Sequence, residues 1–373
     1  MTMDSASDNP NSPFNPLTCN SVAELIGNTP LLRIGSERVK AGGSFWCKLE
    51  GYNPFSIKDR AAYYVIRKAR ERGELQEGSL IVESSSGAMA LGIALAGVVF
   101  HHPVVIVSDP GMEPLVRNLL AASGAKVEIV PRPHPKLGWQ GARLERLKQI
   151  LASNKGAFWP CQYDNPIQVD SYEILANELI RQIPKIDALV CSVGTGGHSH
   201  GVTRYLKRLW PEMKSIAVDS IDSVIFGQPN SPRLIRGMGN SIFPRNINYE
   251  LFDEIHWVAP SEAVAACHEL ARTCFITGGW STGCVYLVGC WVASQMAPDQ
   301  VVVGVFPDGP ERYWNSIFDE RYCKEHNLAT DSDSLPDSPQ TITEPSEPVS
   351  RWTRCLKVVN PSGRRNPSDK AYI

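Results

Sequence analysis

Short apolar runs alternate along this chain with stretches whose apolar residues follow helical spacing. The runs are rich in Val and Ile and apolar on both faces, which is typical of strands buried in parallel sheets; they cover residues 80–83, 104–108, 126–130, 188–193, 215–219 and 301–306. The amphipathic stretches between them predict helices, for example over 113–122 and 171–181. This alternation predicts an α/β fold in which chemistry collects in loops beyond the carboxyl ends of the strands.

The two ends of the chain depart from this pattern. Residues 1–16 are polar and rich in Ser, Asn and Pro, and lack the charged and apolar regions of a signal peptide, so they predict a disordered tail. Residues 331–350 are acidic and rich in Pro and Ser, which predicts a linker, and 351–373 regain apolar character as an appendage that can dock on the body. No apolar run is long enough to predict a transmembrane helix.

Composition narrows the class of protein. The chain has 373 residues, about two domains' worth, and its 37 basic and 39 acidic residues nearly balance. That balance argues against a nucleic-acid partner and against a polybasic membrane surface. The ten cysteines include no CxxC pair, and several lie in apolar runs, which favours buried free thiols, a reducing compartment and a cytoplasmic location.

A glycine-rich turn is the most informative motif. The sequence Gly-Thr-Gly-Gly-His at 194–198 follows an apolar run and precedes a helix-like stretch over 202–209. Glycines let backbone N–H groups converge on an anion, and a helix N-terminus adds partial positive charge, so we expect a phosphate there. A dinucleotide site and a tight turn without a ligand remain alternatives. The first would need glycine where Ser199 stands, although Asp219 lies where a ribose-binding acid would.

Two further segments carry candidate chemistry. Ser56 could cap a helix that begins at Ile57, which places Lys58 in its first turn, where the helix dipole favours a neutral, nucleophilic amine. Ser85 and Ser86 precede a helix over 91–98 and could bind a carboxylate. A solvated lysine and a serine-rich cap are the plainer alternatives. Together, a Schiff-base lysine, an anion loop and a carboxylate loop fit pyridoxal phosphate chemistry on an amino acid.

Five ordered motifs lie over roughly 20–320: LIGNTPLL at 25–32, NPFSIKDR at 53–60, QYDNP at 162–166, GTGG at 194–197 and FPDGPERY at 306–313. Together they resemble the cysteine synthase (O-acetylserine sulfhydrylase) and cystathionine β-synthase family of fold type II pyridoxal-phosphate enzymes. The resemblance implies two open, mainly parallel twisted sheets flanked by helices, as in the tryptophan synthase β-like fold. It also implies a large cofactor-phosphate domain (17–44 plus 166–330), a small mobile substrate domain (45–165) and a homodimer.

The resemblance also implies residue roles. Lys58 would hold the cofactor as an imine and act as acid and base. The other expected cofactor contacts are Gly194, Thr195, Gly196, Gly197, His198, Asp308 and Ala88. The expected contacts of a small-molecule amino-acid substrate are Ser85, Ser86, Gly87, Met89 and Gln162. No metal is expected, since His198 and His200 lack a third ligand nearby.

The implied reaction is β-replacement on O-acetyl- or O-phosphoserine through an aminoacrylate, with sulfide or a thiol as nucleophile. Alternatives are an amine nucleophile giving a diaminopropionate-type product, a β-elimination (cysteine desulfhydrase) reaction, a non-catalytic scaffold, and a nicotinamide oxidoreductase that uses the glycine loop.

Three positions depart from the family pattern. Ala88 and Met89 stand where the family usually has Asn and Thr, and Asp308 replaces a serine expected near the pyridine nitrogen. A carboxylate there would hold that nitrogen protonated, unless Asp308 turns away and caps a turn. The sequence over 223–229, followed by RGMG at 236–239, is similar to a branch that makes diaminopropionate precursors from O-phosphoserine and glutamate.

Overall fold

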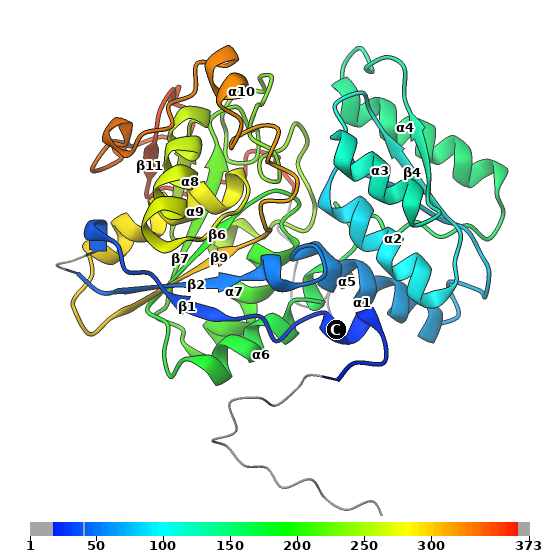
Figure 1. Cartoon of the computed structure of the whole chain (residues 1–373), viewed down its shortest axis with the longest axis horizontal. Coiled ribbons are helices and arrows are strands. Elements are labelled where there is room, and N and C mark those ends of the chain that lie inside the picture. The colour runs from blue at the N-terminus through cyan, green and yellow to red at the C-terminus, as the bar shows by residue number, and fades with distance from the viewer. Residues whose placement is uncertain (1–17, 40–41, 365–373) are drawn as a thin grey trace, which may run out of the picture.

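The computed structural model describes residues 18–39 and 42–364, and it has the expected α/β architecture with two sheets. Figure 1 shows β4 (Val104–Ser108), with helices around it, as a lobe beside the larger sheet. The expected tail over 1–16 and the last nine residues of the appendage lie outside the described residues. No described helix is long and apolar enough to cross a membrane.

The smaller sheet has three parallel strands in the order β3 (Ile81–Ser84), β4, β5 (Lys126–Ile129). Because side chains alternate along β4, Val104 and Ile106 pack in one core and Val105 and Val107 in another. The first core is completed by α1 (Lys58–Glu71), α2 (Ala88–Phe100) and α3 (Pro114–Ala122), and the second by α4 (Gly138–Ser153).

The larger sheet has eight strands. Their spatial order is β1 (Leu31–Arg33), β2 (Ser44–Leu49), β9 (Val301–Phe306), β6 (Ala188–Ser192), β7 (Lys214–Ser220), β8 (Glu254–Val258), β11 (Thr353–Cys355) and β10 (Gln340–Ile342). The strands from β2 to β8 are parallel, while β1 and β11 run antiparallel to their inner neighbours. This central parallel region brings several strand ends to one edge.

Helices cover both faces of this sheet. One core includes α8 (Pro260–Cys274) and α9 (Trp280–Ser294), and the other includes α6 (Glu173–Gln182) and α7 (Gly197–Leu209). The remaining described helices are short: α5 (Ile167–Asp170), α10 (Glu320–Glu325), η1 (Val22–Leu25), η2 (Glu37–Val39), η3 (Glu50–Tyr52), η4 (Tyr249–Leu251) and η5 (Ser332–Ser334).

All six strands predicted from apolar runs are present, with ends within one residue of those expected. The prediction of where α1 begins was one residue early. Ile57 is its N-cap residue, and the Ser56 hydroxyl accepts a 3.2 Å hydrogen bond from the Lys58 amide. The Asp59 carboxylate closes this turn more extensively, because it accepts hydrogen bonds from the amides of Phe55 and Ser56.

Two segments outside the expected large domain form part of the larger sheet, one of them by the docking expected of the appendage. Strand β2 falls almost entirely within the expected small domain (45–165), yet it pairs with β1 and β9 in the larger sheet. Part of the expected linker and appendage (331–373) forms β10 and β11, and β11 pairs with β8. Strands β10 and β11 have three residues each and lie in a polar segment, so the sequence shows no periodic pattern that would predict them.

Candidate active site

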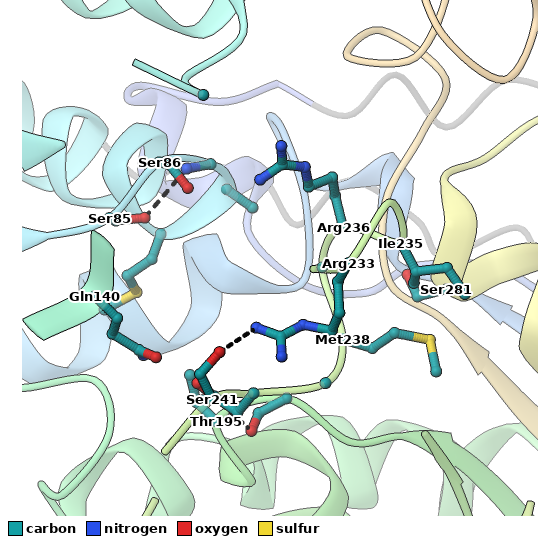
Figure 2. Close-up of a pocket in the computed structure, with 18 of the residues that line it drawn as sticks. Ser85, Ser86, Gln140, Thr195, Arg233, Ile235, Arg236, Met238, Ser241 and Ser281 are labelled. Carbon is teal, nitrogen blue, oxygen red and sulfur yellow. Dashed lines mark hydrogen bonds between the residues drawn. The ribbon is translucent and has the colours of Figure 1, made fainter. Parts of the chain in front are cut away.

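A cleft of about 840 Å³ lies between two lobes, the smaller built on the three-stranded sheet and the larger on the eight-stranded sheet. The smaller lobe contributes the loop 85–89 and Gln140, and the larger lobe contributes Thr195, Asp308 and the loop 230–241. Figure 2 shows Ser85, Ser86 and Gln140 facing the side chains of Arg233 and Arg236 across this space. The loops come from the carboxyl ends of β3, β6, β7 and β9, the position expected for a ligand site in open α/β sheets.

The glycine turn lies at the base of the cleft, between β6 and α7. Gly194, Thr195 and His198 line the cleft, whereas Gly196 and Gly197 lie behind it. Gly196 has a φ of +84°, and a Cβ atom there would lie 2.5 Å from a side-chain carbon of Ile247. Glycine is therefore required at this position both by backbone conformation and by space.

Lys58 lies opposite this turn. Its Nζ donates a 3.0 Å hydrogen bond to the Thr195 hydroxyl. The side chain is half-buried, and desolvation lowers the pKa of its amine to about 8. A larger fraction of this amine is therefore neutral at physiological pH than for an ordinary surface lysine.

His198 presents an unsatisfied ring nitrogen at the same place. The residue is 6 % exposed, and its Nε2 has no hydrogen-bond partner among the described residues. Burial, with a contribution from the Lys58 charge, lowers the pKa of His198 to about 3, so the ring is neutral. His200 instead places Nδ1 2.8 Å from the Asn246 carbonyl oxygen. Across 18–39 and 42–364, no group of three or more His, Cys, Asp or Glu residues is positioned to hold a metal.

The serine loop connects β3 to the N-terminus of α2. Ser85, Ser86, Gly87, Ala88 and Met89 all line the cleft, although Met89 also packs in the core of the smaller lobe. The Ser85 hydroxyl accepts a 3.3 Å hydrogen bond from the Gly87 amide. An anion in front of this loop would meet hydroxyl groups and the N-terminus of a helix of 13 residues.

Gln162 and Glu83 hold the serine loop in place through hydrogen bonds. Gln162 lines the cleft, and its Nε2 donates a 2.7 Å hydrogen bond to the Ser84 carbonyl oxygen. The fully buried Glu83 carboxylate accepts hydrogen bonds from the Ser84 amide, the Trp159 indole and the Gln162 amide. Burial raises the pKa of Glu83 to about 7. Glu83 is fully buried and does not line the cleft, and its hydrogen bonds organise the loop.

Asp308 lines the far end of the cleft, directly after β9. Its carboxylate accepts hydrogen bonds from the Gly279 amide (3.2 Å) and the Tyr313 hydroxyl, and burial raises its pKa. Ser281 also lines the cleft here, whereas the adjacent Trp280 is 1 % exposed and packs in the core. Asp308 therefore both borders the cleft and holds the chain around it.

The two arginines of the cleft were not predicted as site residues. Arg233 donates hydrogen bonds to the Ser241 hydroxyl (3.1 Å) and the Asp222 carbonyl oxygen (3.2 Å). Arg236 is exposed and has no hydrogen bond or ion pair with any described residue. Both guanidinium groups point into the cleft (Figure 2). Arg236 begins the RGMG segment whose resemblance to the diaminopropionate-precursor branch was a signal in the sequence, whereas no motif or periodic pattern indicated Arg233.

These residues fit the cofactor that the sequence leads us to expect. A glycine turn followed by a helix N-terminus suits a phosphate, and a lysine with a lowered pKa suits an aldehyde. The unpartnered Nε2 of His198 offers a further polar contact in the same place. Asp308 and Ser281 add two more polar side chains to the wall of the same cleft.

Comparison with known proteins gives a consistent picture. The family model described as "Pyridoxal-phosphate dependent enzyme" matches residues 22–308. An N-(2-amino-2-carboxyethyl)-L-glutamate synthase of Cupriavidus metallidurans is 33% identical over 82% of this chain and 92% of its own. A probable cysteine synthase of Bacillus subtilis is 31% identical over 79% of this chain and 95% of its own. The crystal structure of a hydrogen sulfide-producing enzyme from Fusobacterium nucleatum superposes with a TM-score of 0.75 at 30% identity, covering 79% of this chain and all of that one.

Proposed function

Because this chain belongs to the pyridoxal-phosphate-dependent enzymes, we propose that it replaces the β-substituent of an O-activated L-serine. The substrate would be O-acetyl- or O-phosphoserine, and sulfide or a thiol is the first candidate nucleophile. The observation that carries the proposal is the position of Lys58, whose Nζ lies 3.0 Å from the Thr195 hydroxyl at the glycine turn. The named activities of the relatives, cysteine synthase among them, support the same class of reaction.

We assign the cofactor contacts to Lys58, the glycine turn, His198 and Asp308. When bound, pyridoxal phosphate supplies an electron-withdrawing ring that stabilises negative charge at the substrate Cα. The amine of Lys58, with its pKa of about 8, removes the Cα proton and later returns it. The bond from Cβ to oxygen breaks, acetate or phosphate leaves, and a bond from Cβ to sulfur forms.

The serine loop orients the substrate. Ser85, Ser86 and the N-terminus of α2 bind the α-carboxylate, and Gln162 holds this loop in place through Ser84. In this proposal the lobe that carries the loop closes over the substrate, because the activated intermediate must be kept from water. The expected division into a large and a small mobile domain is proposed on the same ground, with β2 assigned to the large one.

The test is to mix the cofactor-loaded enzyme separately with O-acetylserine and O-phosphoserine and to follow the visible absorbance of the bound cofactor. The proposal predicts a spectral change with at least one ester, and cysteine formation once sulfide is added. Pyruvate and ammonia without any added nucleophile would indicate β-elimination instead. No spectral response to either ester would contradict the proposal and favour a non-catalytic scaffold.

An amine nucleophile that carries carboxylates is the second candidate. Arg233 and Arg236 point into the cleft, and neither forms an ion pair within the described residues, so both can bind an added carboxylate (Figure 2). One relative is named N-(2-amino-2-carboxyethyl)-L-glutamate synthase, which fits such a nucleophile.

Substitution of Arg236 distinguishes the two nucleophiles. With L-glutamate as nucleophile, Arg236→Gln should raise its KM about tenfold, the cost of one charge-assisted hydrogen bond. The KM for sulfide should not change, because sulfide has no carboxylate. Arg117→Gln, at an exposed position of α3, is the matched control. An unchanged KM for glutamate, or no turnover of glutamate by the parent enzyme, would remove this candidate.

We also propose a homodimer in a reducing cytoplasm. None of the ten cysteines forms a disulfide, and exposed apolar side chains such as Leu32 and Phe275 are available for an interface. Sedimentation at micromolar concentration should give twice the chain mass; a monomer would contradict the dimer.

A further inference from the structure

The C-terminal segment 340–358 lies against residues 221–241, the irregular stretch after β7 that carries Arg233 and Arg236. We call residues 221–241 the cleft loop. It begins with β10, continues through β11, which pairs with β8, and comes after the last residue matched by the family model. Trp352 anchors it: its backbone amide donates to Glu262 (2.8 Å) and its indole N–H lies 3.0 Å from His256 Nδ1. Trp352 is fully buried, so this segment is an integral part of the larger lobe.

Gln228 joins the cleft loop to this segment through three hydrogen bonds. Its Nε2 donates to the carbonyl oxygens of Pro345 (2.7 Å) and Glu347 (2.8 Å), and its Oε1 accepts from the Val349 amide (3.2 Å). Gln228 is 3 % exposed, and all three partners lie in the C-terminal segment. A Cβ atom on the neighbouring Gly227, which has a φ of +98°, would lie 3.4 Å from the Pro345 carbonyl oxygen, at van der Waals distance.

Apolar packing reinforces this attachment. Phe226, two residues before Gln228, is fully buried in a core that also contains Val193, the last residue before the glycine turn. Three partly buried residues of the C-terminal segment, Ile342, Val349 and Val358, pack against the same core. The segment therefore covers apolar surface shared by the cleft loop and the glycine turn.

Further hydrogen bonds tie the loop that carries Gln228 to the glycine turn. The Ser223 hydroxyl, earlier in the same loop, accepts a 3.0 Å hydrogen bond from the Asn240 amide. Asn240 in turn donates through Nδ2 to the Gly194 carbonyl oxygen (3.3 Å), and the Gly239 amide donates to Val193 (2.9 Å). Between these anchors the loop crosses the cleft with Arg233 and Arg236 on it.

We propose that Gln228 is a positioning residue that ties the cleft loop to the C-terminal segment and thereby fixes the shape of the substrate site. The inference rests on the proposed function only where it concerns substrate. Loss of Gln228 removes the hydrogen-bond partner of the buried Pro345 carbonyl group and of the more exposed Glu347 carbonyl and Val349 amide groups, which releases the loop at its outer end. The loop then samples conformations in which the substrate contacts are not formed, so affinity falls while the chemistry at Lys58 is retained.

The first test measures the loop directly, by limited trypsin digestion of the cofactor-loaded enzyme. Gln228→Ala should speed cleavage after Arg233 and Arg236 at least about fivefold, because cleavage follows the population of the open loop. Cleavage after Lys155, in an exposed turn at the end of α4, is the internal reference and should not change. The matched control is Gln295→Ala, at the exposed end of α9.

The second test is kinetic. Gln228→Ala should raise the KM for the O-activated serine about fivefold and change kcat less than about twofold, the pattern of lost positioning rather than lost chemistry. Gln228→Glu keeps the side-chain length and the acceptor for Val349, but its carboxylate faces two carbonyl oxygens without a proton to donate, so the KM should rise at least as much as in Gln228→Ala. This variant also serves if Gln228→Ala does not fold.

Unchanged cleavage at both arginines together with an unchanged KM would overturn the proposal. An equal acceleration at Lys155 would also overturn it, because that would indicate general loosening of the protein. If the parent enzyme turns over no serine ester, the proposed function fails, but the cleavage ratio still decides the role of Gln228.

Discussion

At the scale of single residues, the cleft depends on Lys58, whose amine is neutral at physiological pH more often than that of an ordinary surface lysine. Burial lowers the pKa of Lys58 to about 8, well below the ordinary lysine value of about 10.4. Only the neutral amine attacks an aldehyde, so the protonated fraction limits how fast the cofactor is taken up.

The rate at which cofactor-free protein binds pyridoxal phosphate should therefore rise with pH and level off above a midpoint near 8. Absorbance of the imine, followed after rapid mixing at pH values from 6 to 10, measures this rate. A rate that still rises steeply at the upper limit would show that the amine titrates like a surface lysine, contrary to the account.

Gly196 gives a second prediction at this scale. In Gly196→Ala the new Cβ would lie 2.5 Å from Ile247 Cγ1 and 2.9 Å from the Asn246 carbonyl carbon, at a φ of +84°. We expect loss of about 1–3 kcal/mol of stability from backbone strain, a further cost from the contact, and at least about tenfold weaker cofactor binding.

Gly156→Ala is the matched control, because Gly156 also has a positive φ of +87° but has nothing within 4 Å of its Cβ position. Fluorescence titration with pyridoxal phosphate should show unchanged affinity for this control. Equal affinities for the two variants would mean that the turn does not hold the phosphate.

At the scale of elements, the loop between β3 and α2 is shaped by one buried carboxylate. Glu83→Ala removes three hydrogen bonds, from Ser84, Trp159 and Gln162. At about 1 kcal/mol for each bond, stability should fall by roughly 3 kcal/mol, and the KM for the serine ester should rise because the loop loses its shape.

Urea unfolding and steady-state kinetics measure these two effects. Glu128→Ala, on β5 of the same sheet, is the control, because its carboxylate pairs with Arg146 at the surface. A Glu83 variant with unchanged KM would mean that the serine loop does not bind the substrate.

Local signals explain which elements could be predicted. The glycine turn and Lys58 each lie next to an element that is visible in the sequence, so their places followed from the chain itself. Arg233 and Arg236 lie in an irregular loop that Gln228 ties to the distant C-terminal segment. Strand β11 has three residues and exists because it pairs with β8. Contacts between residues far apart in the chain leave no pattern at either place.

At the scale of the whole molecule, a buried charge network ties α1 to the larger sheet. Glu178 of α6 accepts from Lys48 of β2 (2.7 Å) and from Arg60 of α1 (2.7 Å), and Arg60 also pairs with Glu50. Although burial alone opposes ionisation, hydrogen bonds from Arg60 and Lys48 hold the pKa of Glu178 down at about 2.

Glu178→Gln removes the carboxylate that Lys48 and Arg60 share. Arg60 keeps Glu50, but the buried Lys48 keeps only the neutral oxygens of Thr29 and Gln182, which should cost about 3–5 kcal/mol at pH 7. Because the folded-state pKa lies below the unfolded value of about 4.3, this stabilisation is complete above that value. It is lost as pH falls toward about 2.

Urea unfolding at pH 7 and pH 3 should therefore show a smaller difference between the parent and Glu178→Gln at the lower pH. Glu325→Gln, at an exposed position of α10, should have the same free energy of unfolding as the parent at both pH values. A difference that is independent of pH would contradict the ionic role of Glu178.

The central claim is that Lys58 carries pyridoxal phosphate, and chemical trapping tests it most directly. Borohydride reduction of the cofactor-loaded protein fixes the imine as a stable secondary amine, and mass spectrometry of the digested protein identifies the modified lysine. The account predicts a single pyridoxyl group on Lys58. Modification of a different lysine, or of none while the cofactor remains bound, would contradict it.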